Sequence, residues 1–213
     1  MLELLMAGGK AMIPIGLAAV VALAIIFERL WSLRRTEVLP ANLATEVKAW
    51  ALQHRRLEEE HLRALEQTSA LGEVFAAVLR ARHLGREAIK ERVEDAGRHV
   101  MHGLERFLNS LGTIALIAPL LGLLGTVIGL MNLFLAVMAN GIGDASQMAG
   151  GIGEALVCTA SGLVVAVPSY VMHRYLRGKV VDIGVEMERQ VIGLIDALEL
   201  ETPIMAAPRR VIK

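Results

Sequence analysis

Three long apolar stretches alternate with segments in which charged residues recur along the chain. The apolar stretches cover residues 11–33, 108–139 and 150–173, and there is no Asp, Glu, Lys or Arg between Arg106 and Asp144. Because a helix rises 1.5 Å per residue, about 20 apolar residues cross a hydrocarbon core of about 30 Å. The pattern therefore predicts three transmembrane helices.

The first stretch has a second interpretation, because Ala-Leu-Ala at residues 22–24 resembles the small-residue cleavage site of a signal peptide. The flanking charges favour an uncleaved anchor instead. Lys10 is the one cation before the stretch, whereas Arg29, Arg34 and Arg35 lie at or just after its end. Such a bias orients the N-terminus outward.

The distribution of Lys and Arg predicts the orientation of all three spans. One of these residues precedes the first stretch, fourteen lie between Arg29 and Arg106, none lies in the loop after the second stretch, and seven follow from Arg174 onward. Cytoplasmic flanks carry the excess of positive charge. The predicted order is outer N-terminus, span, cytoplasmic segment, span, outer loop, span and cytoplasmic tail, at residues 1–10, 11–33, 34–107, 108–139, 140–149, 150–173 and 174–213. Glu28 and Arg29 are then expected to snorkel to the inner interface.

The segments predicted to be cytoplasmic are also helical in pattern, rich in Glu, Arg, Leu and Ala with few breakers. Beyond Arg86, apolar residues recur at sums of three and four positions: Ile89, Val93, Val100, Leu104, Phe107 and Leu111. This stripe predicts one long helix that runs directly into the second span. The tail repeats the pattern at Val181, Val185, Val191, Leu194, Ile195 and Leu198. The predicted fold is an all-α membrane protein with long cytoplasmic helical extensions.

The composition agrees with a membrane protein and excludes several other classes. Hydrophobic residues make up 54% of the chain and the mean hydropathy is +0.52, which is too apolar for an ordinary soluble fold. The net charge of +0 lacks the basic excess of a nucleic-acid-binding protein. Cys158 is the single cysteine, so neither an intrachain disulfide nor a cysteine-rich metal site can form. His99 and His102 lack a third ligand nearby, and a solvated helix face explains them better than a metal site does.

Glu154 is the residue that most needs an explanation, because it lies in the third apolar stretch with no Lys or Arg until Arg174. An ionised side chain at a helix centre costs roughly 2.5 to 3.5 kcal/mol, so such groups usually face an interior or a wet cavity. If the span begins near Gly150, Glu154 lies only about 6 Å along it, and an interfacial carboxylate is the alternative. We favour a functional carboxylate.

Other polar residues of the spans are close enough in the pattern to join Glu154. Thr126 and Asn132 lie in the second span and Thr159 in the third. Each could satisfy its own polar groups locally, or together with Glu154 they could line a hydrated path on which the carboxylate gains and loses a proton. Cys158, one helical turn after Glu154, is most simply a small apolar residue.

The glycines and prolines of the spans have simpler structural interpretations. Gly122, Gly125 and Gly129 permit close approach of a neighbouring helix, and we expect packing to be their role. Pro119 and Pro168 each remove a backbone donor, and we expect a kink or a break at both positions.

Two sequence runs resemble a known family. Residues 118–131 (APLLGLLGTVIGLM) and residues 151–168 (GIGEALVCTASGLVVAVP) are similar, in the right order, to two motifs of the ExbB/TolQ proton-channel family, relatives of the flagellar stator protein MotA. The resemblance covers nearly the whole chain. Ile128 stands where an aromatic residue is common, and Cys158 and Ser161 also depart from the usual pattern, which leaves the subtype open.

The resemblance implies a homopentamer in the bacterial inner membrane, with outer segments in the periplasm. Its second and third spans would surround a pore holding two copies of a single-span ExbD/TolR-like partner, and proton flow would drive relative rotation. The work would reach a TonB-like or a TolA-like protein. By motif position Glu154 matches the family's third-span glutamate, and Thr126 and Thr159 match its pore-lining threonines. The resemblance implies no cofactor beyond the proton as coupling ion, no nucleic acid, and contact with membrane lipids.

Two other classes of function are compatible with the pattern. A passive membrane scaffold would use its long cytoplasmic helices as a docking surface and leave Glu154 at the interface. A membrane enzyme is the third interpretation, and the lack of a second convergent catalytic group counts against it.

Overall fold

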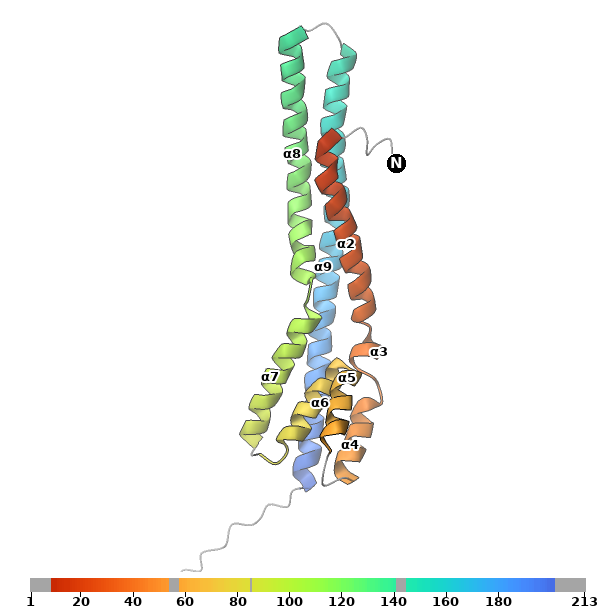
Figure 1. Ribbon diagram of the computed structural model, residues 1–213, viewed down its shortest axis with the longest axis vertical. Coiled ribbons are helices and arrows are strands. Elements are labelled where there is room, and N and C mark those ends of the chain that lie inside the picture. Colours follow the sequence, from red (N-terminus) through yellow and green to blue (C-terminus); the bar gives the residue numbers. More distant parts are fainter. Residues whose placement is uncertain (1–8, 54–57, 85, 141–144, 202–213) are drawn as a thin grey trace, which may run out of the picture. The chain divides into compact units, whose positions relative to one another are not determined.

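The computed structural model describes residues 9–53, 58–84, 86–140 and 145–201, and the regular elements in these ranges are all helices (Figure 1). In chain order they are the 3-10 helix η1 (Gly9–Ala11) and the α-helices α2 (Met12–Ser32), α3 (Arg35–Val38), α4 (Leu43–Gln53), α5 (Glu59–Thr68), α6 (Ala70–Ala81), α7 (Arg86–Leu104), α8 (Leu108–Asn140) and α9 (Ala145–Glu201). The predicted all-α class is confirmed.

The chain divides into two compact units, which are described separately below. Unit 1 contains the described parts of residues 1–31 and 105–178, and unit 2 those of residues 32–104 and 179–213. In the described part of the chain, three helices are long and apolar enough to cross a membrane, and they contain the three apolar stretches of the sequence. Three helices that could span a membrane by length and composition are therefore present at the predicted places.

In unit 1, α8 and α9 pack against each other through glycines. A Cβ atom at Gly122 would lie 2.9 Å from the carbonyl oxygen of Cys158, and one at Gly129 would lie 3.3 Å from the Cβ of Ala155. As the residue number of the α8 glycine rises, the residue number of the α9 residue that it faces falls. The two helices are therefore antiparallel (Figure 1). The predicted packing role of these glycines is confirmed.

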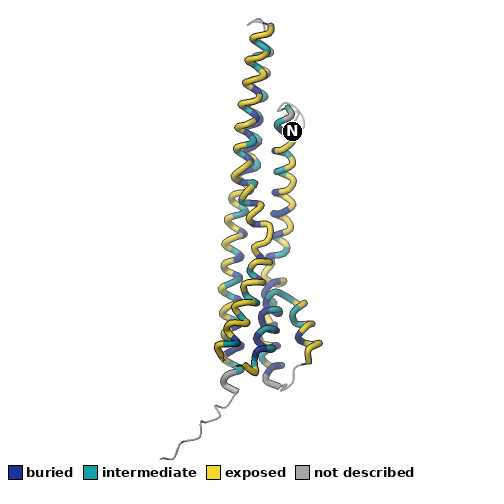
Figure 2. The backbone as a smooth tube through the Cα atoms, turned by 60° about the vertical axis from the view of Figure 1, so that its left-hand side comes forward, coloured by how far each residue is buried: buried dark blue, intermediate teal, exposed yellow. Residues whose placement is uncertain are grey.

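Helix α2 completes unit 1 by packing its N-terminal turn on α9. Met12 and Ile15 of α2 form a buried cluster with Cys158 of α9. On its other face α2 exposes large apolar side chains, with Leu17 67% and Phe27 68% exposed (Figure 2). Water is a poor solvent for such a face, so it needs lipid or another protein against it.

The two prolines lie inside helices and end neither of them. Pro119 is within α8 and Pro168 is within α9, so the expected breaks do not occur, whereas the expected kinks stay a prediction. Next to Pro168, the buried hydroxyl of Ser169 donates to the carbonyl oxygen of Val165 at 2.7 Å. Such side-chain donors are common where a membrane helix carries a proline.

The predicted continuous helix into the second span is wrong, because α7 ends at Leu104 and α8 begins at Leu108. Between them Phe107 has φ +62°, a conformation that bulky residues rarely adopt. The guanidinium groups of Arg29 and Arg106 lie 5.6 and 4.6 Å from the centroid of its ring. These cation–π contacts, which the chain pattern does not reveal, favour the observed conformation.

Arg29 is buried within the protein, whereas snorkelling requires an exposed guanidinium group. It is only 5% exposed, pairs with the neighbouring carboxylate of Glu28, and lies over the ring of Phe107. The Glu28 side chain is 48% exposed. The guanidinium therefore finds its partners within the protein, and only Glu28 keeps the exposed position that snorkelling requires.

In unit 2 the central helix is α6, which buries five large side chains at 2% exposure or less: Leu71, Val74, Phe75, Val78 and Leu79. The helix begins at an N-cap, where the Ser69 hydroxyl oxygen accepts from the Gly72 N–H at 3.1 Å. A Cβ at Gly72 would lie 2.2 Å from the Leu65 carbonyl oxygen, so α5 approaches α6 at a distance that only glycine permits.

The part of α9 in unit 2 is helical, as predicted for the tail. Its buried face differs from the one that the sequence pattern predicted. The buried side chains recur three or four residues apart, at Val180, Ile183, Met187, Val191 and Leu194. Val181 and Val185, predicted for this face, are 55% and 63% exposed. The helix has apolar residues on more than one side here, so the sequence stripe did not define which side would be covered.

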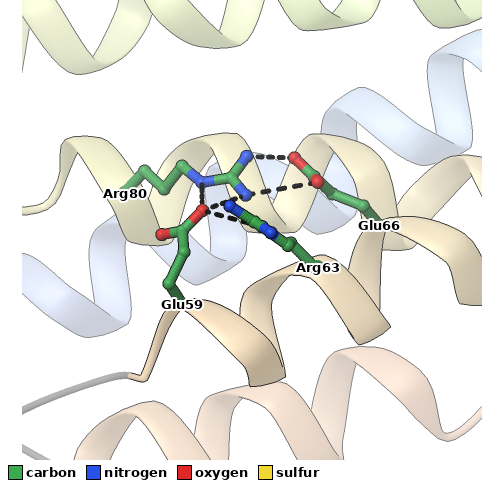
Figure 3. A network of polar contacts seen from close by, with 4 residues as sticks. All are labelled: Glu59, Arg63, Glu66 and Arg80. Atoms are coloured by element: carbon green, nitrogen blue, oxygen red, sulfur yellow. Dashed lines mark hydrogen bonds and ion pairs between the residues drawn. The ribbon is translucent and has the colours of Figure 1, made fainter.

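Charged residues on the surface of unit 2 tie α5 to α6 (Figure 3). Arg80 of α6 hydrogen-bonds Glu66 and Glu59 of α5, and Arg63 lies 3.8 Å from the same Glu59 carboxylate. The hydrogen bond to Glu66, aided by Glu59, raises the pKa of Arg80 above its usual value despite some desolvation. This network is structural, because its charges satisfy one another.

Candidate functional site

Unit 1 contains a cavity of about 540 Å³ beside Glu154, which we call the Glu154 cavity. Its lining comes from the N-terminal end of α2 with η1, from α8 and from α9: Gly9, Ala11, Pro14, Leu121, Leu124, Gly125, Ile128, Gly129, Asn132 and Glu154. Among these described residues one carboxylate and one amide side chain face an otherwise apolar wall. A ligand or water in this cavity would find its polar contacts at Glu154 and Asn132.

Local packing directs Glu154 to this place. Cys158 lies one helical turn after Glu154, so the two side chains share a face of α9. Cys158 is 1% exposed and packs against Met12 and Ile15 at the start of α2. The side chain of Glu154 therefore points to the side of α9 on which the chain enters α2.

The backbone of η1 lies directly against the carboxylate. Gly9 has φ +61°, and a Cβ atom built on it would lie 1.9 Å from Oε1 and 3.0 Å from Cδ of Glu154. The Glu154 side chain is accordingly half-buried, between the turn and the cavity that it lines. The contact joins residues 145 positions apart in the chain.

Apolar helix surface continues past the level of Glu154. Gly129 faces Ala155, so the part of α8 that follows Asn132 extends beyond the carboxylate. In that part Phe134 is 67% and Met138 is 82% exposed. About two helical turns of exposed apolar surface therefore separate the level of Glu154 from the end of α8.

The two threonines have other hydrogen-bond partners. Thr126 Oγ1 donates to the Leu123 carbonyl oxygen at 2.6 Å, and Thr159 Oγ1 donates across the helix pair to the Gly122 carbonyl oxygen at 3.4 Å. Neither threonine lines the Glu154 cavity. Within one chain the structure thus brings Glu154 together with Asn132 and not with Thr126 or Thr159, whose pore-lining role stays a prediction about the assembly.

The remaining candidates have the positions that their simpler interpretations require. Cys158 is buried in an apolar cluster, as predicted for a small apolar residue. His99 and His102 are exposed on α7. Among the described residues no group of three or more His, Cys, Asp or Glu side chains has an arrangement that could hold a metal ion.

Sequence reasoning missed the contribution of η1 to this site. Gly9 lies just before the first apolar stretch and Pro14 lies near its start, and neither residue carries a polar side chain. The one available signal is the glycine pair at positions 8 and 9, because paired glycines often mark a turn. Which side chain that turn would contact cannot be inferred from such a local signal.

One protein family and several of its named members are similar to this chain. The family model of the MotA/TolQ/ExbB proton channel family matches residues 55–189. A protein of Synechocystis that carries the name ExbB-like 1 is 35% identical over 182 residues, 83% of this chain and 70% of the relative. ExbB-like 3 from the same organism is 30% identical over 176 residues, 81% of this chain and 82% of the relative. The biopolymer transport protein ExbB of Salmonella typhimurium is 34% identical over 145 residues, 57% of this chain and 59% of the relative.

Proposed function

Because the chain belongs to the MotA/TolQ/ExbB proton channel family, we propose that it is the proton-channel subunit of an energy-transducing complex in the bacterial inner membrane. In this complex the proton motive force drives mechanical work for TonB-dependent outer-membrane transport or for a Tol-type envelope system. The family, the three apolar helices and the carboxylate beside the Glu154 cavity support this function together.

The proposed topology has residues 1–10 and 140–149 in the periplasm and residues 34–107 and 174–213 in the cytoplasm. Its support is the sorting of Lys and Arg, which are abundant on the cytoplasmic flanks and sparse on the periplasmic ones. A topology with three spans, the N-terminus outside and the C-terminal tail inside is consistent with every flank.

The proposed assembly is a homopentamer around an ExbD/TolR-like single-span partner, with Thr126 and Thr159 lining the pore and a TonB-like or TolA-like protein receiving the work. One chain with three spans and one such carboxylate cannot enclose a continuous proton path. The exposed apolar side chains of α2, α8 and α9 are the surfaces that lipids, further copies and the partner would cover.

The single observation that carries the proposal is the Glu154 cavity. The Glu154 carboxylate lies beside a cavity, and about two turns of exposed apolar helix separate its level from the end of α8. This position fits an intramembrane proton site better than it fits a contact with lipid headgroups. A proton crossing 100 mV releases about 2.3 kcal/mol, whereas shifting a pKa by one unit takes about 1.36 kcal/mol. The gradient is therefore large enough to change the protonation of one carboxyl group by more than a tenfold ratio.

The test is proton flux through the complex reconstituted with its partner in lipid vesicles. We expect Glu154→Gln to lower the flux nearly as much as Glu154→Ala, because neither side chain can titrate. Glu188→Gln is the matched control, since it makes the same change at an exposed position of the same helix and is expected to leave the flux unchanged.

Unchanged flux in both Glu154 variants would remove the carboxylate from the proton path. If the reconstituted wild-type complex also carried no proton current, the passive scaffold with a cytoplasmic docking surface would be the better description. A purified monomer without accessory subunits would point to the same alternative.

A further inference from the structure

The contact between η1 and Glu154 is closer than packing of a helix end requires. Gly9 adopts φ +61°, in the left-handed region, and its backbone lies against the carboxylate with no room for a Cβ atom, which would come 1.9 Å from Oε1. Two features therefore favour glycine at this position, although the Glu154 carboxyl group, at the end of a flexible side chain, could rotate away from a Cβ atom. The first is the backbone conformation and the second is the approach of the carboxylate.

The turn is held in this place by contacts on both sides. The next described side chain, Ala11, has its Cβ atom 3.2 Å from where a Cβ at Gly125 of α8 would lie. Met12 and Ile15, which follow it, are 6% and 2% exposed and pack against Cys158 of α9. Since α8 and α9 both fix the start of α2, a side chain at position 9 could not be accommodated by moving the turn alone.

The carboxylate would then have to move instead. Glu154 has three rotatable bonds, and its side chain borders the Glu154 cavity, which Gly9 and Asn132 also line. A residue larger than glycine at position 9 would rotate the carboxyl group out of its observed place. The glycine thus determines where in the cavity the carboxylate lies.

We propose that Gly9 is a positioning residue for Glu154: the glycine turn at the start of α2 forms one wall of the Glu154 cavity and holds the carboxyl group in place. The consequence for proton transfer rests on the proposed function, whereas the positioning itself does not. The first helix then contributes to the acidic site as well as anchoring the chain.

A double-mutant cycle tests the contact directly in the full-length protein in lipid. Glu154→Asp shortens the side chain by one methylene and withdraws the carboxyl group from position 9. The readout is the rate at which dicyclohexylcarbodiimide, an apolar reagent for carboxylic acids, modifies residue 154, followed by mass spectrometry of the peptide. Each rate with Gly9→Ala is divided by the rate with Gly9 in the same background.

We expect Gly9→Ala to raise the modification rate by roughly threefold or more in the Glu154 background, within the range of coupling between residues in contact. In the Glu154→Asp background the same change should have less than half that effect, because the collision has been relieved. Strain from φ +61° is the same in both backgrounds and cancels in the comparison. The matched control is Gly16→Ala, since a Cβ at Gly16 meets nothing within 4 Å and the rate should not change.

Equal ratios in the two backgrounds, or no change with Gly9→Ala, would overturn the proposal. If Gly9→Ala fails to fold, Gly9→Asn replaces it, because asparagine tolerates positive φ but still carries the Cβ atom. The modification rate needs no partner and no proton gradient. Normal proton flux with Glu154→Gln would overturn the proposed function, whereas an unchanged modification rate with Gly9→Ala would overturn the positioning contact. The two failures are therefore distinguishable.

Discussion

Gly162 has the closest backbone contact in the α8–α9 pair. A Cβ at this position would lie 2.6 Å from the carbonyl oxygen of Ala118, an atom that cannot rotate away. Glycines of this kind allow two membrane helices to approach through their backbones, which gains van der Waals contact along the pair. The separation of α8 and α9, and hence the width of the Glu154 cavity, depends on such residues.

We expect Gly162→Ala to destabilise unit 1 by about 1–3 kcal/mol, the usual cost of forcing an extra carbon into a packed interior. The measurement is the free energy of unfolding in detergent or lipid, compared with Gly178→Ala on the same helix, where a Cβ meets nothing within 4 Å. Equal stability of the two variants would contradict the assigned close approach.

Some residues of this site could be predicted from the sequence and others could not. Glu154 could be singled out because a carboxylate in an apolar stretch is costly without a purpose. Gly9 could not, because its role depends on a contact with a residue 145 positions away. The hydroxyls of Thr126 and Thr159 bond to carbonyl oxygens here, an alternative the pattern had left open.

Whole elements were more predictable than their faces and junctions. The apolar windows define α2, α8 and the first part of α9 because length and hydropathy are local properties of the sequence. The break lies at Phe107, whose ring contacts the guanidinium groups of Arg29 and Arg106, and the contact with Arg29 forms only in the folded chain. Val181 and Val185 were assigned to the wrong side of α9 for the same reason, since neighbouring helices decide which apolar side is covered.

In unit 2 the carboxylate of Glu186 on α9 forms an ion pair with Arg35 on α3. This ion pair should make the stability of the protein depend on pH. The Glu186 carboxylate accepts from Gln190 at 2.9 Å and from Arg189 at 3.2 Å, and lies 3.7 Å from Arg35. The hydrogen bond from Gln190 and the two arginines lower the pKa of Glu186 below its usual 4.5, although partial burial opposes them. The ionised form is therefore favoured in the folded state.

A lowered pKa gives stability that is present above the unfolded value and is lost as the pH falls through the folded one. We expect the melting temperature of Glu186→Gln to be below that of the wild type at neutral pH and to approach it at an acidic pH below the lowered pKa of Glu186, where the wild-type carboxylate is protonated. The matched control is Glu188→Gln, two residues further along α9. A difference between Glu186→Gln and wild type that is the same at both pH values would contradict the assigned ion contacts.

At the scale of the whole molecule, the chain combines a unit whose outer surface is apolar with a unit that has a conventional helical core. Unit 1 exposes residues such as Ile13 and Met138 at 72% and 82%, whereas unit 2 buries Phe75 and Leu71 completely. In a single chain in water, the apolar surface of unit 1 would be exposed to a solvent that disfavours it. Family membership and these surfaces together support a proton-channel subunit that works in a membrane and in an assembly.

On the proposed function, Glu154 changes protonation when protons cross the assembled complex. Infrared difference spectroscopy on the complex in lipid, recorded as a proton gradient is imposed, detects the carbonyl band of a carboxylic acid directly. We predict a carboxyl band that appears in the wild type, persists in Glu188→Gln and is lost in Glu154→Gln. A difference spectrum that is the same in the wild type and in Glu154→Gln would contradict it.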